Sequence, residues 1–204
     1  MPRACLPPCV AFAAILTIVL MGPTVAAEKE HLRLDIAGAL PPAEAEAIYQ
    51  RVRKEMAESY APADDPVARN YPRWRRFNIA PYLSATHGNR YANNYANPKA
   101  AKAGYGKLKP GQQMPPGAVV VKDTFTVTNE GEVFPGALFY MEKLAPGRSP
   151  DTGDWRFVQM LPDGSYLGDT VGDNAADVGF CFTCHKAMAE VDFLFFLPDD
   201  YRRK

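Results

Sequence analysis

Hydrophobic and polar residues first repeat with a helical spacing. Two prolines precede residues 43–60 (AEAEAIYQRVRKEMAESY), in which Ile48, Val52 and Met56 recur four apart and the remainder is mostly charged. This spacing places the apolar side chains on one face of a helix, and proline is tolerated in the first turn of a helix. The pattern predicts an amphipathic helix that lies on the core, followed by a loop rich in Pro and Asp over residues 61–83.

Farther along the chain, apolar and polar residues alternate. Residues 118–127 (AVVVKDTFTV) are rich in β-branched residues and nearly alternating, which is typical of a strand. Asn97-Pro98 predicts a short helix over residues 98–105, with the asparagine as its cap. Further strands are predicted over residues 87–97, 137–144, 155–161 and 166–170. Short turns join the later strands, so the sequence predicts an α+β domain, a mainly antiparallel β-sheet with N-terminal and peripheral helices.

Composition narrows the class of protein. The 204-residue chain has 23 Lys+Arg and 23 Asp+Glu, so its formal net charge is zero. A nucleic-acid-binding protein needs a basic excess to neutralise phosphates, so the sequence predicts no nucleic-acid partner. With 47% hydrophobic and 23% charged residues, the chain is typical of a folded globular protein.

The N-terminus has the pattern of an export signal. Arg3 is the only charged residue before Glu28, and an apolar run over residues 10–20 is followed by Val25-Ala26-Ala27. Small residues at these positions suit a signal peptidase, so we expect cleavage after residue 27 and one mature domain over residues 28–204. An uncleaved membrane anchor is the alternative, but the run is shorter than the roughly 20 residues of a span. The expected location is the periplasm, with no stable membrane span after cleavage.

The chemistry lies near the C-terminus, where Cys181-Phe182-Thr183-Cys184-His185 forms a C-x-x-C-H motif, the attachment pattern of c-type haem. Two thiols at this spacing can reach the two vinyl groups of one porphyrin, and the adjacent histidine can bind the iron. Attachment takes place outside the cytoplasm, in agreement with the predicted export. We therefore expect one haem c, with Cys181 and Cys184 as thioethers and His185 as iron ligand.

Two other interpretations of the cysteine pair stay open. A thioredoxin-like pair would be expected early in the chain, after a strand and in a βαβ setting. A zinc site would need ligands beyond the motif, and His31 and His87 are the additional histidines.

No sixth iron ligand is marked in the sequence. Met188 is the only methionine after His185 and is too close in sequence to reach the opposite haem face. The upstream candidates are Met114, Met141, Met160 and His87. The simplest expectation is an open or gated sixth position, which suits small-molecule binding or chemistry. A plain electron-transfer cytochrome with an unrecognised sixth ligand is the alternative.

An ordered set of segments resembles the cytochrome P-460 family over roughly residues 74–202. The segments are HGNRYANNYAN, MPPGAVVVKDTFTV, PGALFYMEKL, GDWRFVQMLPDGS, FCFTCH and DFLFFLPDDYR. The resemblance implies a periplasmic, mostly β, homodimeric monohaem protein. It implies an oxidoreductase that oxidises hydroxylamine or nitric oxide and passes electrons to a soluble acceptor cytochrome. Cytochromes c′-β, the related proteins that bind nitric oxide without turnover, are the alternative.

The same resemblance assigns a role to Lys122. In cytochromes P-460 a lysine nitrogen is bonded to the porphyrin edge, and Lys122 in VVVKD matches that lysine. Alternation places Lys122 on a strand face with Val120 and Thr124, where a solvated ammonium fits poorly. A desolvated lysine loses its proton more easily and becomes nucleophilic. The alternative is a lysine that protects an edge strand from aggregation.

Residues around the haem are less specified. Hydroxylamine oxidation releases protons, so a carboxylate near the iron would help, and Asp173, Asp177 and Glu142 are the candidates. Phe125, Phe139 and Phe157 are candidates to line the pocket, although each also fits an ordinary sheet core.

Overall fold

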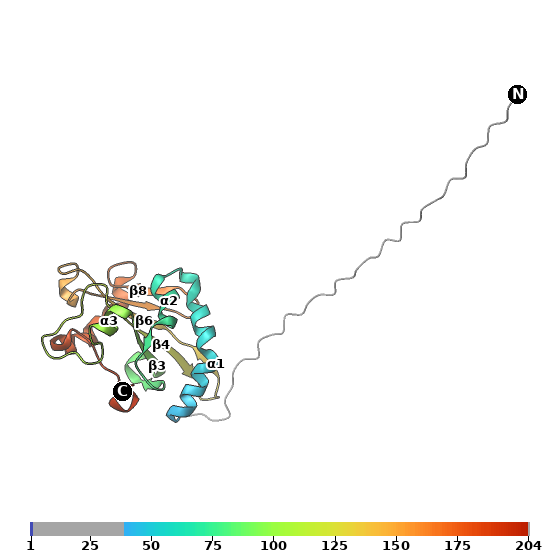
Figure 1. The fold of residues 1–204 in the computed structure, drawn as a ribbon, viewed down its shortest axis with the longest axis horizontal. Helices are drawn as coiled ribbons and strands as arrows, with labels where there is room; N and C mark the ends of the chain where they lie inside the picture. Colours follow the sequence, from blue (N-terminus) through green and yellow to red (C-terminus); the bar gives the residue numbers. More distant parts are fainter. Residues whose placement is uncertain (2–38, 204) are drawn as a thin grey trace. The chain divides into compact units, whose positions relative to one another are not determined.

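The computed structural model describes Met1 and residues 39–203, so residues 2–27 of the predicted signal peptide (residues 1–27) lie outside the described residues. The described chain contains one antiparallel sheet with helices around it (Figure 1). The predicted α+β class is confirmed.

The long helix predicted at the start is present as α1 (Pro42–Tyr60), and it buries Ile48, Val52 and Met56 as the four-residue spacing predicts. The segment expected as a loop over residues 61–83 is more ordered than predicted. It contains α2 (Pro66–Asn70), whose first turn is capped by Asp65: the carboxylate accepts hydrogen bonds from the backbone N–H groups of Val67 and Ala68.

The remaining helices are short. The asparagine cap predicted at residue 97 is confirmed, because the side chain of Asn97 accepts from the backbone N–H of Ala100 at 2.8 Å; the helix that it caps, α3 (Pro98–Lys102), ends earlier than predicted. The last α-helix is α4 (Gly179–His185). Short 3-10 helices are η1 (Ala61–Ala63), η2 (Tyr71–Arg73), η3 (Ala85–His87), η4 (Pro150–Thr152), η5 (Ala175–Val178), η6 (Lys186–Val191) and η7 (Asp199–Tyr201).

The sheet of the described residues has eight antiparallel strands. They are β1 (Arg75–Arg76), β2 (Tyr82–Ser84), β3 (Arg90–Ala96), β4 (Val119–Val127), β5 (Val133–Pro135), β6 (Leu138–Lys143), β7 (Trp155–Met160) and β8 (Tyr166–Asp169). The main order is β1-β3-β4-β6-β7-β8, with β2 paired to β3 and β5 paired to β4. The long strand β4 is therefore central, with hydrogen-bonded neighbours on both sides.

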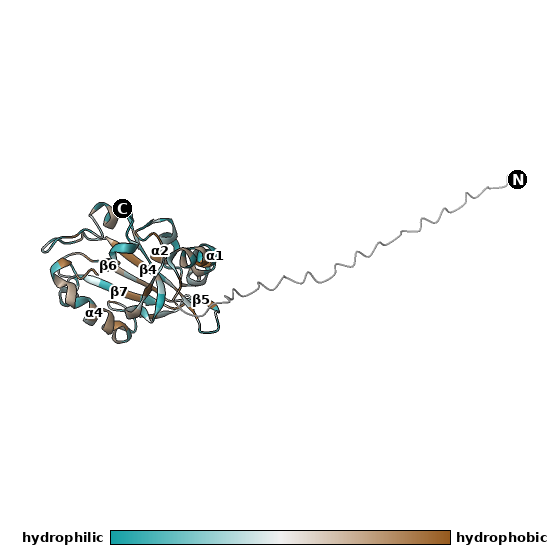
Figure 2. Ribbon diagram, turned by 90° about the horizontal axis from the view of Figure 1, so that it is seen from below, coloured by the Kyte–Doolittle hydropathy of each residue, from teal (hydrophilic) through white to brown (hydrophobic). Residues whose placement is uncertain are grey.

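The two faces of the sheet carry different layers. On β4, Val119 and Val121 belong to a core cluster with α1, whereas Val120 belongs to a second cluster with Phe157 and the C-terminal segment. This alternation is the period of two that a strand imposes on its side chains. Figure 2 shows α1 and α4 on opposite sides of β4 and β7.

A buried carboxyl group ties α1 to the sheet. Asp123 is 1% exposed, and its oxygens accept hydrogen bonds from the Tyr49 hydroxyl at 2.8 Å and the Asn93 amide at 2.9 Å. Burial raises the pKa of Asp123 to about 6, against the opposing effect of these hydrogen bonds and of Arg76. This network lies on the α1 face, because Asp123 alternates with Lys122 along β4.

None of the helices in the described part of the chain combines the length and the apolar character needed to cross a membrane.

Candidate haem site

A cavity of about 320 Å³ opens on the sheet face opposite α1. Its walls come from the central strands β4, β6 and β7, from residues 82–87, and from the C-terminal segment that begins with α4. Aromatic and aliphatic side chains predominate, with a few polar groups among them, as expected of a cofactor pocket. The two histidines His87 and His185, both cysteines of the motif, and Lys122 are among the lining residues.

The C-x-x-C-H motif occupies the last five residues of α4. Cys181 and Cys184 are three residues apart on this helix and both line the cavity, as i and i+3 residues share a helix face. Both thiols are free, and burial raises the pKa of Cys181 to about 11. The structure therefore directs both predicted thioether sulfurs at one cavity.

His185 ends α4 and is oriented by the chain that follows. Its Nδ1 lies 2.7 Å from the backbone carbonyl oxygen of Phe193, which can only accept, so Nδ1 carries the hydrogen and Nε2 has a free lone pair. The rings of Phe157 and Phe195 pack edge-on against the imidazole, with centroid-to-centroid distances of 5.3 and 5.2 Å. Burial lowers the pKa of His185 to about 4, which keeps the imidazole in the neutral form that binds metals.

Lys122 lines the same cavity from the middle of β4. It pairs with Asn94 on β3 and with Phe139 on β6, so the edge-strand interpretation of this lysine is wrong. Burial lowers the pKa of Lys122 to about 8, with a smaller opposing effect from Cys184. The side chain is therefore closer to its neutral, nucleophilic form than a solvated lysine is.

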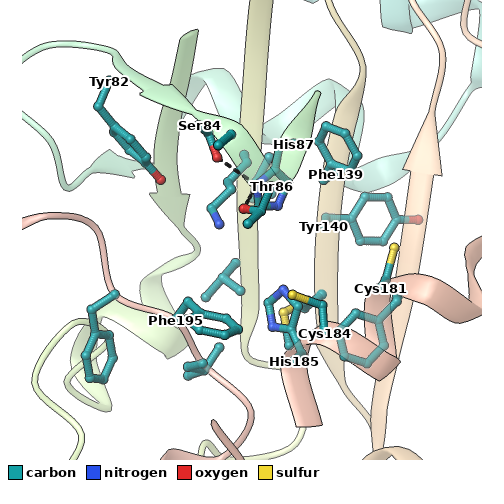
Figure 3. A pocket seen from close by; sticks show the side chains of 18 of the residues that line it. Tyr82, Ser84, Thr86, His87, Phe139, Tyr140, Cys181, Cys184, His185 and Phe195 are labelled. Atoms are coloured by element: carbon teal, nitrogen blue, oxygen red, sulfur yellow. Dashed lines mark hydrogen bonds between the residues drawn. The ribbon is translucent and has the colours of Figure 1, made fainter. Parts of the chain in front are cut away.

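A second group of side chains faces the motif across the cavity: Ser84, Thr86, His87 and Phe139 (Figure 3). The ring of His87 meets Phe139 edge-on, with centroids 5.0 Å apart. The Ser84 and Thr86 hydroxyls lie 2.8 and 3.1 Å from the same ring nitrogen, Nδ1. Burial lowers the pKa of His87 to about 3, so this imidazole is neutral as well.

The hydroxyl pair also indicates the tautomer of His87. Ser84 is only 7% exposed, and the described residues offer its hydroxyl hydrogen no acceptor other than Nδ1 of His87. A buried donor is expected to be paired. Nδ1 then accepts, and the ring hydrogen belongs on Nε2. Of the four candidates for a sixth ligand in the sequence, His87 and Met141 line the cavity.

The other residues considered from the sequence separate into two groups. Met141, Phe139 and Phe157 line the cavity. Met114 and Met160 are buried elsewhere, and Phe125 stacks on Tyr91 on the α1 side of the sheet at a centroid distance of 5.1 Å.

None of the three candidate carboxylates lines the cavity. Asp173 and Asp177 are exposed, and Glu142 accepts a hydrogen bond from Arg156 at 3.0 Å. Within the described part of the chain, the cavity wall contains no aspartate or glutamate. The titratable side chains that do line the cavity are those of His87, His185, Lys122, the two cysteines and several tyrosines.

The donor set fits a haem. Two thiols on one helix face and an imidazole with a free Nε2 meet at an apolar cavity, whereas the described residues contain no cluster of three or more His, Cys, Asp or Glu suited to hold a metal ion directly. A mainly antiparallel sheet that carries such a motif beside a cavity is typical of a class of β-sheet haem proteins.

Comparison with known families agrees with that class. The family model described as Cytochrome P460 matches residues 68–196, which is more than half of the chain and includes Lys122, the cavity strands and the motif. The chain belongs to the cytochrome P460 family, and it is a haem-binding cytochrome. A search of curated proteins finds no match.

Proposed function

We propose that this protein is an exported c-type cytochrome that binds and oxidises hydroxylamine or nitric oxide at a haem held by His185. The observation that carries the proposal is the meeting of Lys122 with Cys181, Cys184 and His185 at one cavity, although some 60 residues of chain separate the lysine from the motif. This is the constellation that the resemblance to cytochromes P-460 implies.

Haem attachment assigns a separate role to each residue of the motif. Cys181 and Cys184 would form the thioethers, and Nε2 of His185 would bind the iron, since Nδ1 is held by the Phe193 carbonyl. When bound, the haem supplies an iron that takes up a small nitrogen compound and removes electrons singly. An external acceptor, a soluble cytochrome, then receives these electrons.

The chain's own residues shape the side of the cavity that faces the motif. Phe139 excludes water, and His87 offers a hydrogen-bond donor, Nε2–H, to a substrate oxygen or nitrogen. Lys122 lines the same cavity and pairs with Phe139 across the sheet. Its depressed pKa favours the neutral amine, the form that would bond to the porphyrin edge when an external two-electron oxidant removes one N–H and one porphyrin C–H hydrogen.

A gas-binding role without turnover is the second candidate. Hydroxylamine oxidation needs a proton acceptor, and the wall of the cavity contains no carboxylate among the described residues. A neutral histidine and an aromatic ring suit the capture of a diatomic gas such as nitric oxide.

The lysine bond is tested on the purified holoprotein. We expect intact mass to show one covalently attached haem, and a digest to give a peptide in which Lys122 is joined to the haem peptide. Lys122→Ala is expected to abolish that joint peptide and to move the Soret band to the position of an ordinary haem c. Lys99→Ala, which alters an exposed hydrogen bond to Pro116 O, is the matched control and should leave both unchanged.

Activity separates the two candidate functions. Reduction of an artificial dye that depends on hydroxylamine supports the enzyme. Nitric oxide binding with no such reduction selects the gas-binding role, and a low-spin six-coordinate spectrum in both redox states would contradict both. Absence of attached haem in the mass spectrum would overturn the proposal as a whole.

Location and assembly complete the proposal. Covalent haem attachment requires export, so we place the mature protein in the periplasm after cleavage behind Ala27. The resemblance implies a homodimer. Fractionation with N-terminal sequencing tests the first statement, and sedimentation of the holoprotein tests the second.

A further inference from the structure

A buried ion pair between Lys143 and Asp192 involves the residue directly before Phe193, whose carbonyl group orients His185. Lys143 at the end of β6 and Asp192 after η6 have side chains that are 7% and 1% exposed, and Lys143 Nζ lies 2.5 Å from Asp192 Oδ1. Lys143 also donates to the Gly153 carbonyl at 2.8 Å and lies over the ring of Trp155 at 5.0 Å. Removing one partner of such a pair leaves a buried charge uncompensated, so the pair constrains both segments that carry it.

Asp192 is held from three separate parts of the chain. Besides Lys143, its carboxylate accepts from the backbone N–H of Met114 at 2.7 Å. Its own backbone carbonyl accepts from the indole N–H of Trp155 on β7 at 2.9 Å. These contacts fix both the side chain and the peptide group of one residue, and that peptide group leads directly into Phe193.

The backbone at this point adopts a conformation that L residues avoid. Asp192 and Phe193 have φ values of 58° and 62°, and a positive φ is uncommon for a bulky residue such as phenylalanine. Such a conformation persists only where surrounding contacts over-determine it, and it is typical of functional sites. Here it turns the Phe193 carbonyl toward Nδ1 of His185 at 2.7 Å.

The ring of Phe193 packs closely against Gly153. A Cβ atom at Gly153 would lie only 2.1 Å from the ring, and Gly153 itself has a φ of +63°, so this position requires glycine. The ring also packs against Phe182 of α4, with centroids 5.9 Å apart. The Phe193 segment is thus held by side chain, backbone and ring together.

We propose that the Lys143–Asp192 pair is a positioning device for the axial ligand: by fixing the Phe193 carbonyl against Nδ1 of His185, it sets the basicity of the imidazole and thereby the reduction potential of the iron. A hydrogen bond from the second ring nitrogen raises the basicity of a ligating histidine. A more basic ligand stabilises the oxidised iron and lowers the potential. The inference rests on haem attachment at His185 and is independent of which substrate the protein uses.

The test uses Asp192→Asn in the haem-loaded protein. The amide keeps an oxygen for the Met114 N–H but loses the charge that holds Lys143. We expect the iron–histidine stretching band of the reduced protein, measured by resonance Raman, to shift to lower frequency and the midpoint potential to rise. Intact mass checks haem attachment first, so a failure of the proposed function is recognised separately.

The matched control removes a carboxylate from another partly buried ion pair. Glu46→Gln breaks the contact of Glu46 with Arg76, at 2.5 Å, between α1 and β1 on the other side of the sheet. It is expected to lower stability while leaving the vibrational band and the potential where they are in the parent protein.

A second variant covers the case in which Asp192→Asn does not fold. Trp155→Phe keeps an aromatic ring but removes the indole N–H donated to the Asp192 carbonyl, and it should shift both quantities in the same direction by a smaller amount. Unchanged frequency and potential in Asp192→Asn would overturn the proposal, as would unchanged values in Trp155→Phe if that is the variant that folds.

Discussion

The two histidines of the cavity carry their ring hydrogen on different nitrogen atoms. At His185, Nδ1 donates to a backbone carbonyl and Nε2 keeps a free lone pair. At His87, Nδ1 is approached by two hydroxyl groups, so it accepts and Nε2 carries hydrogen. One imidazole is thereby prepared as a metal ligand and the other as a hydrogen-bond donor.

This difference predicts the effect of replacing His87. A donor that contacts bound nitric oxide slows its release, and a hydrogen bond of about 1–1.5 kcal/mol corresponds to roughly a tenfold change in rate. We expect His87→Leu to release nitric oxide from the reduced protein about ten times faster. The measurement is stopped-flow dissociation into a nitric oxide scavenger.

Two further variants control for shape and for the tautomer. His87→Gln retains an N–H donor and is expected to recover most of the slow release. Ser84→Ala removes the closer hydroxyl and should give an intermediate rate. Equal rates in the parent protein and His87→Leu would show that Nε2–H does not contact the bound gas.

At the scale of elements, Asp123 makes the docking of α1 depend on pH. Its pKa is raised from 3.8 to about 6 by burial, so between these values the folded protein holds more protons than the unfolded chain. The free energy of unfolding therefore falls as pH rises through this window. Above about pH 6 it is lower by the full cost of ionising the buried Asp123 carboxyl group. The groups that face Asp123 are Tyr49, Tyr71, Asn93 and Arg76.

Asp123→Asn should remove this dependence. Relative to the parent protein, we expect the variant to gain up to about 3 kcal/mol between about pH 4 and pH 7, since one pKa unit corresponds to about 1.36 kcal/mol. The measurement is denaturant unfolding of both proteins at each pH, and the difference between the two profiles cancels the other titrating groups. Parallel profiles would mean that Asp123 is ionised in the fold as readily as in the unfolded chain.

Periodicity was sufficient to predict the longer elements. The four-residue spacing of Ile48, Val52 and Met56 identified α1, and alternation identified β4. The short strands β1 and β2 and the five-residue helix α2 were missed, because so few residues give no period to detect. Their order comes from specific contacts instead, such as the Asp65 cap and the pairing of Tyr82 with Ala92.

The site was predictable where chemistry has a fixed spacing. Cys181, Cys184 and His185 follow from the motif alone, and Lys122 from the resemblance to a family. The positions of His87 and Phe193 were not predictable, because each depends on where a loop returns to the sheet. The Phe193 carbonyl in particular is a backbone group, and every residue type has one, so the sequence does not indicate its role.

At the scale of the described domain, the sheet separates a closely packed, largely apolar core from a cavity. Toward α1 the sheet is packed, with Tyr60, Phe125 and Met56 fully buried. Toward α4 it borders a cavity of about 320 Å³. Side chains that line a cavity gain dispersion contacts from a group bound in it, whereas side chains in a packed core already have them, so the two sides should differ in their dependence on the cofactor.

This asymmetry predicts the pattern of amide hydrogen exchange when the haem is left out. In protein produced without haem attachment, amides of α4 and of residues 82–87 should exchange faster than in the holoprotein, because these segments would lose their partner across the cavity. Amides of α1 should keep their protection, since α1 packs on the other face of the sheet. Amides of β4 should keep theirs as well, because β3 and β6 pair with this strand on both sides although its side chains line the cavity. Mass spectrometry of peptides from both forms makes the comparison. A uniform loss of protection would show that the haem holds the whole domain together rather than one side of its sheet.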